Sequence, residues 1–247
     1  MSVVITTYNN ASTLERCIRS VPFAAEILVV DSFSSDGTLA LALALGARGE
    51  QMAFKGYGQQ KQFAIDQARY DLVLLLDADE ALSTQLANEI DQLLHAPGPL
   101  APCRLRREEW LYWRWPARGT RLTRHLRLFD RRQVNMGQHP VHAAPQTTLP
   151  THTLKGRLRH FGHDDMAGQL DRINFYPPAT ADSGCAPAGP MTAWRILLAP
   201  PSAFVREYVL RRQFLNGWAG FFAARLAALH AFLRHAKRLE SRRKPSD

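Results

Sequence analysis

The sequence predicts an α/β fold with a doubly wound, mostly parallel sheet, followed by a basic and amphipathic C-terminal helical extension. Over residues 1–100, apolar strand-like runs alternate with helix-like periods, and two of the runs end in carboxylates. The charge then changes sign along the chain. A length of 247 residues is enough to bury a full core, either as one domain or as a domain with an appendage.

The first two strands and the helix between them predict the start of a parallel sheet. Residues 3–6 form a β-branched strand, and after a polar turn Ser12 and Glu15 have the spacing of a capping box at a helix start. Residues 27–30 form a second apolar run, which ends in Asp31. Strands that alternate with helices at this spacing imply right-handed crossovers.

The next elements continue the alternation. We expect a helix over 38–45, a strand near 48–53 and a helix around 59–68 after a glycine-containing turn. The apolar run 72–76 has no polar face, which is typical of a central strand covered by helices on both sides. Ser83 then has the position of an N-cap for a further helix.

Acidic residues follow the central strand directly, as Asp77, Asp79 and Glu80. Ligands of open α/β sheets bind at the carboxyl ends of the strands, where Asp31 and Tyr8 are also expected. Closely spaced carboxylates suit a divalent cation that carries nucleotide phosphates. We therefore expect Tyr8 to pack on a base, Asp31 to accept a hydrogen bond from the base edge, and Asp77 and Asp79 to hold ribose and metal. Taken alone, such acids would equally begin an ordinary loop.

Charge divides the chain into an acidic and a basic part. Residues 1–100 hold 6 Lys/Arg and 12 Asp/Glu, whereas residues 101–247 hold 25 and 10. Residues 104–132 carry ten arginines among three tryptophans, a pattern that suits nucleic acid, an anionic sugar-phosphate acceptor or a membrane interface. We expect no nucleic-acid partner, because no recognised nucleic-acid module is present.

The expected domain division follows these composition changes. Residues 1–178 are the main domain, with a nucleotide-binding half over 1–100 and an acceptor-side half over 101–178; a flexible loop over 179–190 precedes an amphipathic helical tail over 191–247. In the tail, apolar residues from Trp218 to Leu233 share one helical face, while basic residues interrupt the run. This pattern predicts a helix at the membrane interface or a helix packed on protein, and not a spanning helix.

The cysteines and the first residues predict a cytoplasmic protein. Cys17, Cys103 and Cys185 are far apart and odd in number, which favours neither a disulfide framework nor a zinc cluster. A strand begins almost at once, and this leaves no room for a secretory leader.

Four segments, in order over most of residues 3–90, resemble the nucleotide-sugar-binding half of family 2 glycosyltransferases with the GT-A fold: VVITTYNN, VVDSFSSDGT, GYGQQKQFA and LLLDADEALS. Later segments resemble the bacterial lipopolysaccharide-core subgroup more loosely: LRLFDRR, PVHA, LRHFGH, residues 170–176 and FLNGWAGF. The resemblance implies an inverting transfer of a hexose from a nucleotide sugar, with a uridine preference, to a glycolipid acceptor. It also implies Mg2+ or Mn2+ and a peripheral position on the inner face of the cell membrane.

Carried over by position, the resemblance assigns Thr7, Tyr8 and Asp31 to the base, Asp77 to ribose or metal and Asp79 to the metal. Lys61, after the glycines, could also meet a phosphate. The expected donor-binding residues are Thr7, Tyr8, Asn9, Asp31, Lys61, Asp77 and Ala78, and the expected metal ligands are Asp77 and Asp79.

The catalytic base stays open. An inverting transfer needs a group that takes the proton of the acceptor hydroxyl. Members of the subgroup often carry His-Glu where this chain has His142-Ala143. The candidates are therefore Glu80, Glu108, Glu109, His142 and Asp164. The missing Glu also keeps open a catalytically degenerate adaptor that binds membrane or lipid, and a polyprenyl-phosphate glycosyltransferase is a further alternative.

Overall fold

The computed structural model describes residues 1–136, 144–162, 166, 168–170 and 191–243, which belong to two compact units. The first unit comprises Met1–Glu108 and Thr123–Gly162, and the second comprises Glu109–Leu122 and the chain from His163 onward. The segment Glu109–Leu122 is thus grouped with the C-terminal helices and not with the sheet. The expected loop over 179–190 lies outside the described residues.

The first unit contains an eight-stranded sheet of order β3-β2-β1-β4-β7-β6-β10-β5, which confirms the α/β class. Its parallel half consists of β1 (Ser2–Thr7), β2 (Glu26–Asp31), β3 (Arg48–Gln51) and β4 (Leu72–Asp77). In register, Thr6 of β1 aligns with Val30 of β2 and with Asp77 of β4, so the carboxyl ends of these strands meet at one edge.

The other half of the sheet is antiparallel and was not predicted. It consists of β5 (Glu80–Leu82), β6 (Cys103–Glu109), β7 (Thr123–Asp130) and β10 (His152–His160). Strand β7 lies antiparallel to β4, with Leu74 beside Leu128. A short 3-10 helix, η1 (Arg131–Gln133), leads from β7 to a two-stranded ladder of β8 (Asn135–Met136) and β9 (Pro145–Gln146).

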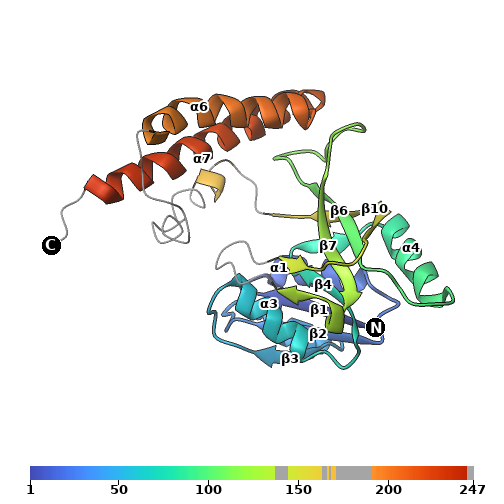
Figure 1. Ribbon diagram of the computed structural model, residues 1–247. Coiled ribbons are helices and arrows are strands. Elements are labelled where there is room, and N and C mark those ends of the chain that lie inside the picture. Colours follow the sequence, from blue (N-terminus) through green and yellow to red (C-terminus); the bar gives the residue numbers. More distant parts are fainter. Residues whose placement is uncertain (137–143, 163–165, 167, 171–190, 244–247) are drawn as a thin grey trace. The chain divides into compact units, whose positions relative to one another are not determined.

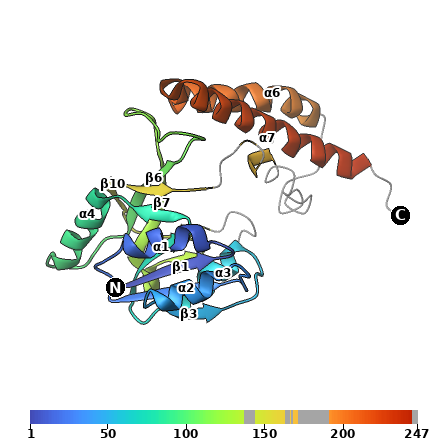
Figure 2. The same ribbon diagram turned by 180° about the vertical axis from the view of Figure 1, so that it is seen from behind.

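Helices cover both faces of the parallel half, as doubly wound topology requires. Helices α1 (Ala11–Arg19) and α2 (Thr38–Ala44) pack with the apolar face that includes Ile5 and Val29, while α3 (Tyr57–Asp66) packs with the opposite face, which includes Val4 and Leu28. Figure 1 shows α3 on the near face of the sheet, and Figure 2, seen from behind, shows α1 and α2 there. Helix α4 (Thr84–His95) packs on β10, and the Ser83 hydroxyl caps it as predicted, accepting from the Leu86 N–H at 3.3 Å.

The capping box predicted at Ser12 is wrong. Helix α1 begins at Ala11, so Ser12 lies inside it, and its N-cap Asn10 makes no side-chain cap hydrogen bond. The N–H of Ala11 instead donates to Asp36 Oδ2 at 3.0 Å, across 25 residues. The Asp36 carboxylate, in the loop after β2, therefore replaces a local N-cap and links the loops after β1 and β2.

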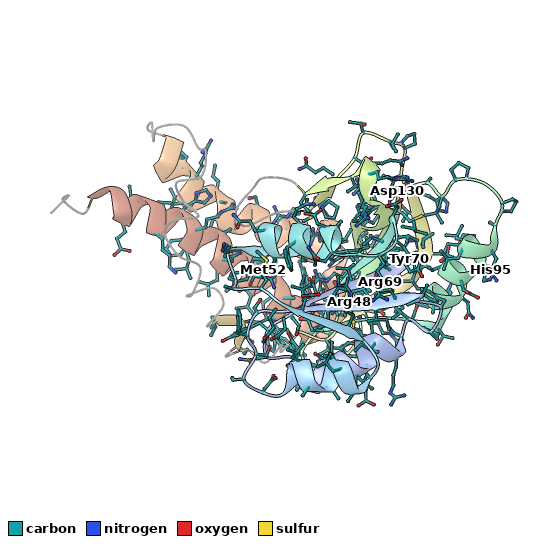
Figure 3. The ribbon with its side chains drawn as sticks, turned by 90° about the horizontal axis from the view of Figure 1, so that it is seen from below. Arg48, Met52, Arg69, Tyr70, His95 and Asp130 are labelled. Atoms are coloured by element: carbon teal, nitrogen blue, oxygen red, sulfur yellow. The ribbon has the colours of Figure 1, made fainter. Side chains whose placement is uncertain are left out.

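A buried glutamate anchors the amino ends of the strands. Glu26 at the start of β2 pairs with Arg48 Nε at 3.0 Å and with Arg69 Nε at 3.6 Å, and it accepts from the Arg69 backbone N–H at 2.7 Å. Arg48 and Arg69 lie near each other in Figure 3. This edge of the sheet is therefore closed by fully paired side chains.

The second unit is a helical hairpin. Helix α6 (Met191–Val205) continues through a π-helical turn, η3 (Arg206–Leu210), and a 3-10 turn, η4 (Gln213–Asn216), into α7 (Gly217–Arg243). Both views show α6 and α7 side by side. Buried Asn216 joins the segment Glu109–Leu122 to the hairpin, because its Oδ1 accepts from the Ala117 N–H at 2.7 Å and its Nδ2 donates to Thr120 at 3.1 Å.

The contact of β10 with α4 predicts a large cost for a single added methyl group. A Cβ at Gly156 would stand 2.4 Å from Leu86 Cα and 2.5 Å from Leu86 N, so the backbone of α4 would have to move. We expect Gly156→Ala to lower the free energy of unfolding by about 3 kcal/mol. Urea denaturation checks this. Gly49→Ala is the control, because its Cβ would meet only side-chain atoms of Leu39 and Leu43 and no backbone, so it should cost clearly less. Equal costs would contradict the prediction.

Candidate functional site

The loops after β1 and β2 are joined by hydrogen bonds around Asn9. This residue has φ 53°, and its N–H donates to Ser34 Oγ at 2.8 Å while its Oδ1 accepts from the Ser35 N–H at 2.9 Å. Thr7 is buried, and its carbonyl accepts from the Ser32 N–H at 3.0 Å. Tyr8, by contrast, is 61% exposed. The expected donor-binding loop is thus held firmly and presents one open aromatic ring.

Asp31 is fully buried at the end of β2. Its carboxylate accepts from the Ser34 N–H at 2.9 Å, from the Ser34 hydroxyl, and from Gln51 Nε2 at 3.3 Å. All three of these donors are neutral. Gln51 is exposed and makes the longest of these bonds, so it is the donor that a ligand could replace most easily. Sequence reasoning missed Gln51, the last residue of β3, because this strand has no strong apolar pattern.

Two cations hold Asp77 at the end of β4. Lys61 Nζ lies 2.7 Å from its Oδ1 and Arg127 Nη2 lies 2.9 Å from its Oδ2, while Thr6 Oγ1 donates to Oδ1 at 3.3 Å. Burial alone would raise the pKa of Asp77, but the charges of Lys61 and Arg127 outweigh it and hold the pKa well below its usual value. Both oxygens of this expected metal ligand are therefore engaged by cations.

Glu80 lies behind Asp77 and shares its cation. Arg127 Nη2 is 2.7 Å from Glu80 Oε1, Arg107 Nε is 3.3 Å from the same oxygen, and the Asp77 N–H donates to Oε2 at 3.0 Å. Glu80 is 1% and Arg127 is 4% exposed. Arginines therefore engage one oxygen of Glu80, an expected base candidate, and a backbone N–H engages the other.

Asp79 has a different partner from the other acids. Its Oδ2 lies 3.0 Å from His160 Nε2, and its carbonyl accepts from the Phe161 N–H at 2.7 Å. Burial would raise the pKa of Asp79, but the hydrogen bond from His160 outweighs it and lowers the pKa. The guanidinium of Arg16 lies over the Phe161 ring, 4.1 Å from its centroid. The segment after β10 is thereby fixed beside the acids.

Asp79 and His160 together offer an oxygen and a nitrogen that could bind a divalent cation. The side chain of Asp79 is 26% exposed and is hydrogen-bonded to His160, while the charge of Arg107 also lowers its pKa. Within the described ranges no group of three or more His, Cys, Asp and Glu side chains forms a complete cation site. Among the described residues, Asp79 and His160 therefore supply only part of a coordination sphere.

Among the described base candidates, Glu80 and Glu108 are buried and paired with arginines. Glu108 is 2% exposed and pairs with Arg157 and, at 3.7 Å, with Arg159, whereas Glu109 belongs to the second unit. His142 and Asp164 lie outside the described residues. The sequence analysis assigned no role to Arg127 and His160, although both stand in motifs that carry the resemblance. A lone arginine among Leu126, Leu128 and Phe129 was the available signal for a buried charge partner.

Replacement of Arg127 by methionine should leave two buried carboxylates without their shared cation. We expect a loss of about 3–5 kcal/mol in the free energy of unfolding at pH 7. In the wild type, the low pKa of Asp77 stabilises the fold above the unfolded-state value of about 3.9, and this stabilisation is lost as the pH falls through the folded-state pKa.

In the Arg127→Met variant the carboxyls should protonate at higher pH, so the deficit should shrink as the pH falls from 7 toward 5. Urea denaturation over this pH range measures it. Arg132→Met, which removes an exposed ion pair with Asp130, is the control and should have little effect. A deficit independent of pH would contradict the assignment.

Comparison with known proteins identifies the family. Residues 2–150 match the model described as Glycosyl transferase family 2. A lipopolysaccharide core biosynthesis glycosyltransferase of Rhizobium meliloti (strain 1021) is 30% identical over 96% of this chain and 91% of its own. An uncharacterized glycosyltransferase of Rickettsia prowazekii (strain Madrid E) is 26% identical over 96% and 86%.

Among solved structures, glucosyl-3-phosphoglycerate synthase from Mycobacterium tuberculosis, in complex with Mn2+, UDP and glucosyl-3-phosphoglycerate, is 24% identical over 44% of this chain and 43% of its own, with a TM-score of 0.36. That likeness is too partial for its ligands to be transferred. The family match and the relative from Rhizobium meliloti are sufficient on their own: this chain belongs to glycosyl transferase family 2 and is a glycosyltransferase.

Proposed function

We propose that this glycosyltransferase moves a hexose, with inversion, from a nucleotide-sugar donor to a glycolipid acceptor of the lipopolysaccharide-core type. The observation that carries the proposal is the edge formed by the carboxyl ends of β1, β2 and β4, where Tyr8, Asp31, Asp77 and Asp79 occur on adjoining strand ends. The name of the Rhizobium meliloti relative supports the acceptor class. A uridine nucleotide is the donor that the family resemblance favours.

Donor recognition would begin with the base and the ribose. The exposed ring of Tyr8 stacks on the base, and Thr7 and Asn9 hold the loop that carries it. Asp31 accepts a hydrogen bond from the base edge once Gln51 has moved aside. Asp77 accepts a hydrogen bond from a ribose hydroxyl, and Ala78 lies beside it. Lys61, whose ammonium group pairs with Asp77, would contact the first phosphate next to that ribose.

The leaving diphosphate would be bound near Asp79. We assign the metal to Asp79 and His160, with the diphosphate oxygens completing the sphere, and Mg2+ or Mn2+ would stabilise the negative charge of the departing nucleotide. Both carboxylate oxygens of Asp77 already pair with Lys61 and Arg127, so we assign Asp77 no oxygen that binds the metal. Asp77 would contribute only the charge of this paired cluster. Glu80 positions Asp77 by accepting from its N–H, so we propose that the base is one of Glu108, Glu109, His142 and Asp164.

Loss of the Asp79 or the His160 side chain should abolish transfer of the sugar. We expect Asp79→Asn and His160→Ala each to lower donor turnover by at least about 100-fold and to weaken Mn2+-dependent UDP binding, because each removes a metal ligand. Release of UDP from candidate UDP-sugars, with and without acceptor, measures turnover. The control is Asp91→Asn on the exposed face of α4.

Full activity of Asp79→Asn would contradict the metal assignment. The same assay tests the alternatives to the proposal. A wild-type protein that neither transfers nor hydrolyses any donor would indicate the degenerate adaptor, whereas transfer to polyprenyl phosphate in preference to a core glycolipid would favour that acceptor.

The second unit supports a lipid-facing role. Along α6, an apolar stripe at helical spacing is open to solvent: Trp194 and Leu197 are each 65% exposed, and Leu198, Pro201 and Val205 continue it. Residues 191–243 hold ten Lys/Arg and two Asp/Glu. An apolar stripe with a tryptophan, among basic residues, is typical of helices that lie in the interface of an anionic membrane.

The same unit contains an apolar pocket of ≈ 420 Å³. Arg225 is the charged residue among those that line the pocket, most of which belong to α7. The lining residues are Met166, Pro200, Phe222, Arg225, Leu226, Ala228, Leu229 and Phe232. Such a lining suits an acyl chain with an anionic group near Arg225. Among the helices that the structure describes, none is both long and apolar enough to cross a bilayer, so the proposed association is peripheral.

Charge placed on the stripe of α6 should release the protein from membranes. We expect the double variant Leu197→Glu/Leu198→Glu to weaken binding to phosphatidylglycerol vesicles by about 100-fold, since each leucine would otherwise bury its side chain in the interface. Vesicle co-sedimentation measures the partition. Leu149→Glu, an exposed leucine of the first unit, is the control. Unchanged binding of the double variant would reject the interfacial role of α6.

A further inference from the structure

Gln60 in the first turns of α3 is a buried amide without a partner. It is 3% exposed, and in the described part of the chain neither its Oε1 nor its Nε2 makes a hydrogen bond. A glutamine amide carries two donors and a two-fold acceptor, and nearly all such buried groups in proteins are paired. An unpaired amide destabilises the fold, so an apolar side chain of the same size would be the better structural choice here.

The position of Gln60 in the fold places its amide where a bound donor could form hydrogen bonds with it. Helix α3 follows β3 and precedes β4, so it begins at the carboxyl edge of the parallel strands. Gln60 lies one turn before buried Ala64, on the helix face that packs on the sheet. The next residue, Lys61, reaches Asp77 at 2.7 Å. Gln60 therefore stands at the same edge as the proposed donor site.

The start of α3 adds a second feature that favours an anion. The helix has ten residues and begins after Gly56, which has φ 119°, and its N-cap makes no side-chain hydrogen bond. The first N–H groups of a helix have no partners within it, and the helix dipole makes this end attractive to phosphate. A ligand with both a phosphate oxygen and a hydroxyl would satisfy the helix end and both ends of the amide.

We propose that Gln60 is a donor-recognition residue. Its Nε2 donates to a phosphate oxygen of a nucleoside diphosphate at the start of α3, and its Oε1 accepts from a ribose hydroxyl. This assignment rests on the proposed function, because it places the amide in the same nucleotide site. Gln60 thereby joins Lys61 and Asp77 in holding the ribosyl diphosphate.

The test compares Gln60→Met with Gln59→Met, which makes the same change at an exposed position one residue earlier. Titration calorimetry with UDP and with uridine, in Mn2+, gives the affinities, and thermal denaturation gives the Tm. We expect Gln60→Met to keep or raise the Tm, to raise the Kd for UDP by about 10- to 100-fold, and to affect uridine less. Gln59→Met should have the same Tm, the same Kd for UDP and the same Kd for uridine as the wild type.

An unchanged Kd for UDP in Gln60→Met would overturn the proposal, and so would equal losses for UDP and uridine. A lower Tm would show that the amide stabilises the fold, which also contradicts it. Gln60→Leu and Gln60→Ala repeat the test, and failure of all three variants to fold would assign Gln60 to the structure alone. If the wild type binds no nucleoside diphosphate, the proposed function itself fails. If the wild type and the Gln60 variant bind UDP equally well, only the role of Gln60 fails.

Discussion

The sharing of Arg127 between Asp77 and Glu80 is the interaction on which the candidate site depends. The guanidinium reaches both carboxylates within 3 Å, Lys61 supplies a second cation to Asp77, and Arg107 a second to Glu80. Buried charges are tolerated only when they are paired in this way. Because the partners come from α3, β4, β5, β6 and β7, the cluster joins the parallel half of the sheet to the antiparallel half at the edge where the donor is proposed to bind.

The same cluster divides the acids by role. Asp77 and Glu80 are neutralised by arginine and lysine, which stay charged throughout the physiological range. Asp79 faces His160, a side chain that can itself bind a metal. An incoming cation would have to displace a fixed positive charge at Asp77, but at Asp79 it would meet a compatible ligand. Electrostatics therefore favours Asp79 as the acid that faces the metal.

The parts of the fold that follow from local pattern were predictable, and those that depend on distant partners were not. Strands β1, β2 and β4 are visible in short apolar runs, and the Ser83 cap is visible in one capping residue. The cap of α1 was not predictable, because its acceptor comes from Asp36 in the next loop. Strand β5 and the role of Arg127 likewise depend on partners 47 or more residues away in the sequence, which no local periodicity records.

The two ends of the parallel strands differ in how completely their polar groups are paired, and this difference has a physical meaning. At the amino end, Glu26 is satisfied by two arginines and a backbone N–H. At the carboxyl end, Asp31 is buried with only neutral donors, and the amide of Gln60 has no partner among the described residues. Both ends belong to the same strands and the same core, so chain propensity does not account for the contrast. The unpaired amide of Gln60 costs stability, and a bound nucleotide would restore that stability, which is why this edge is the one that we assign to the donor.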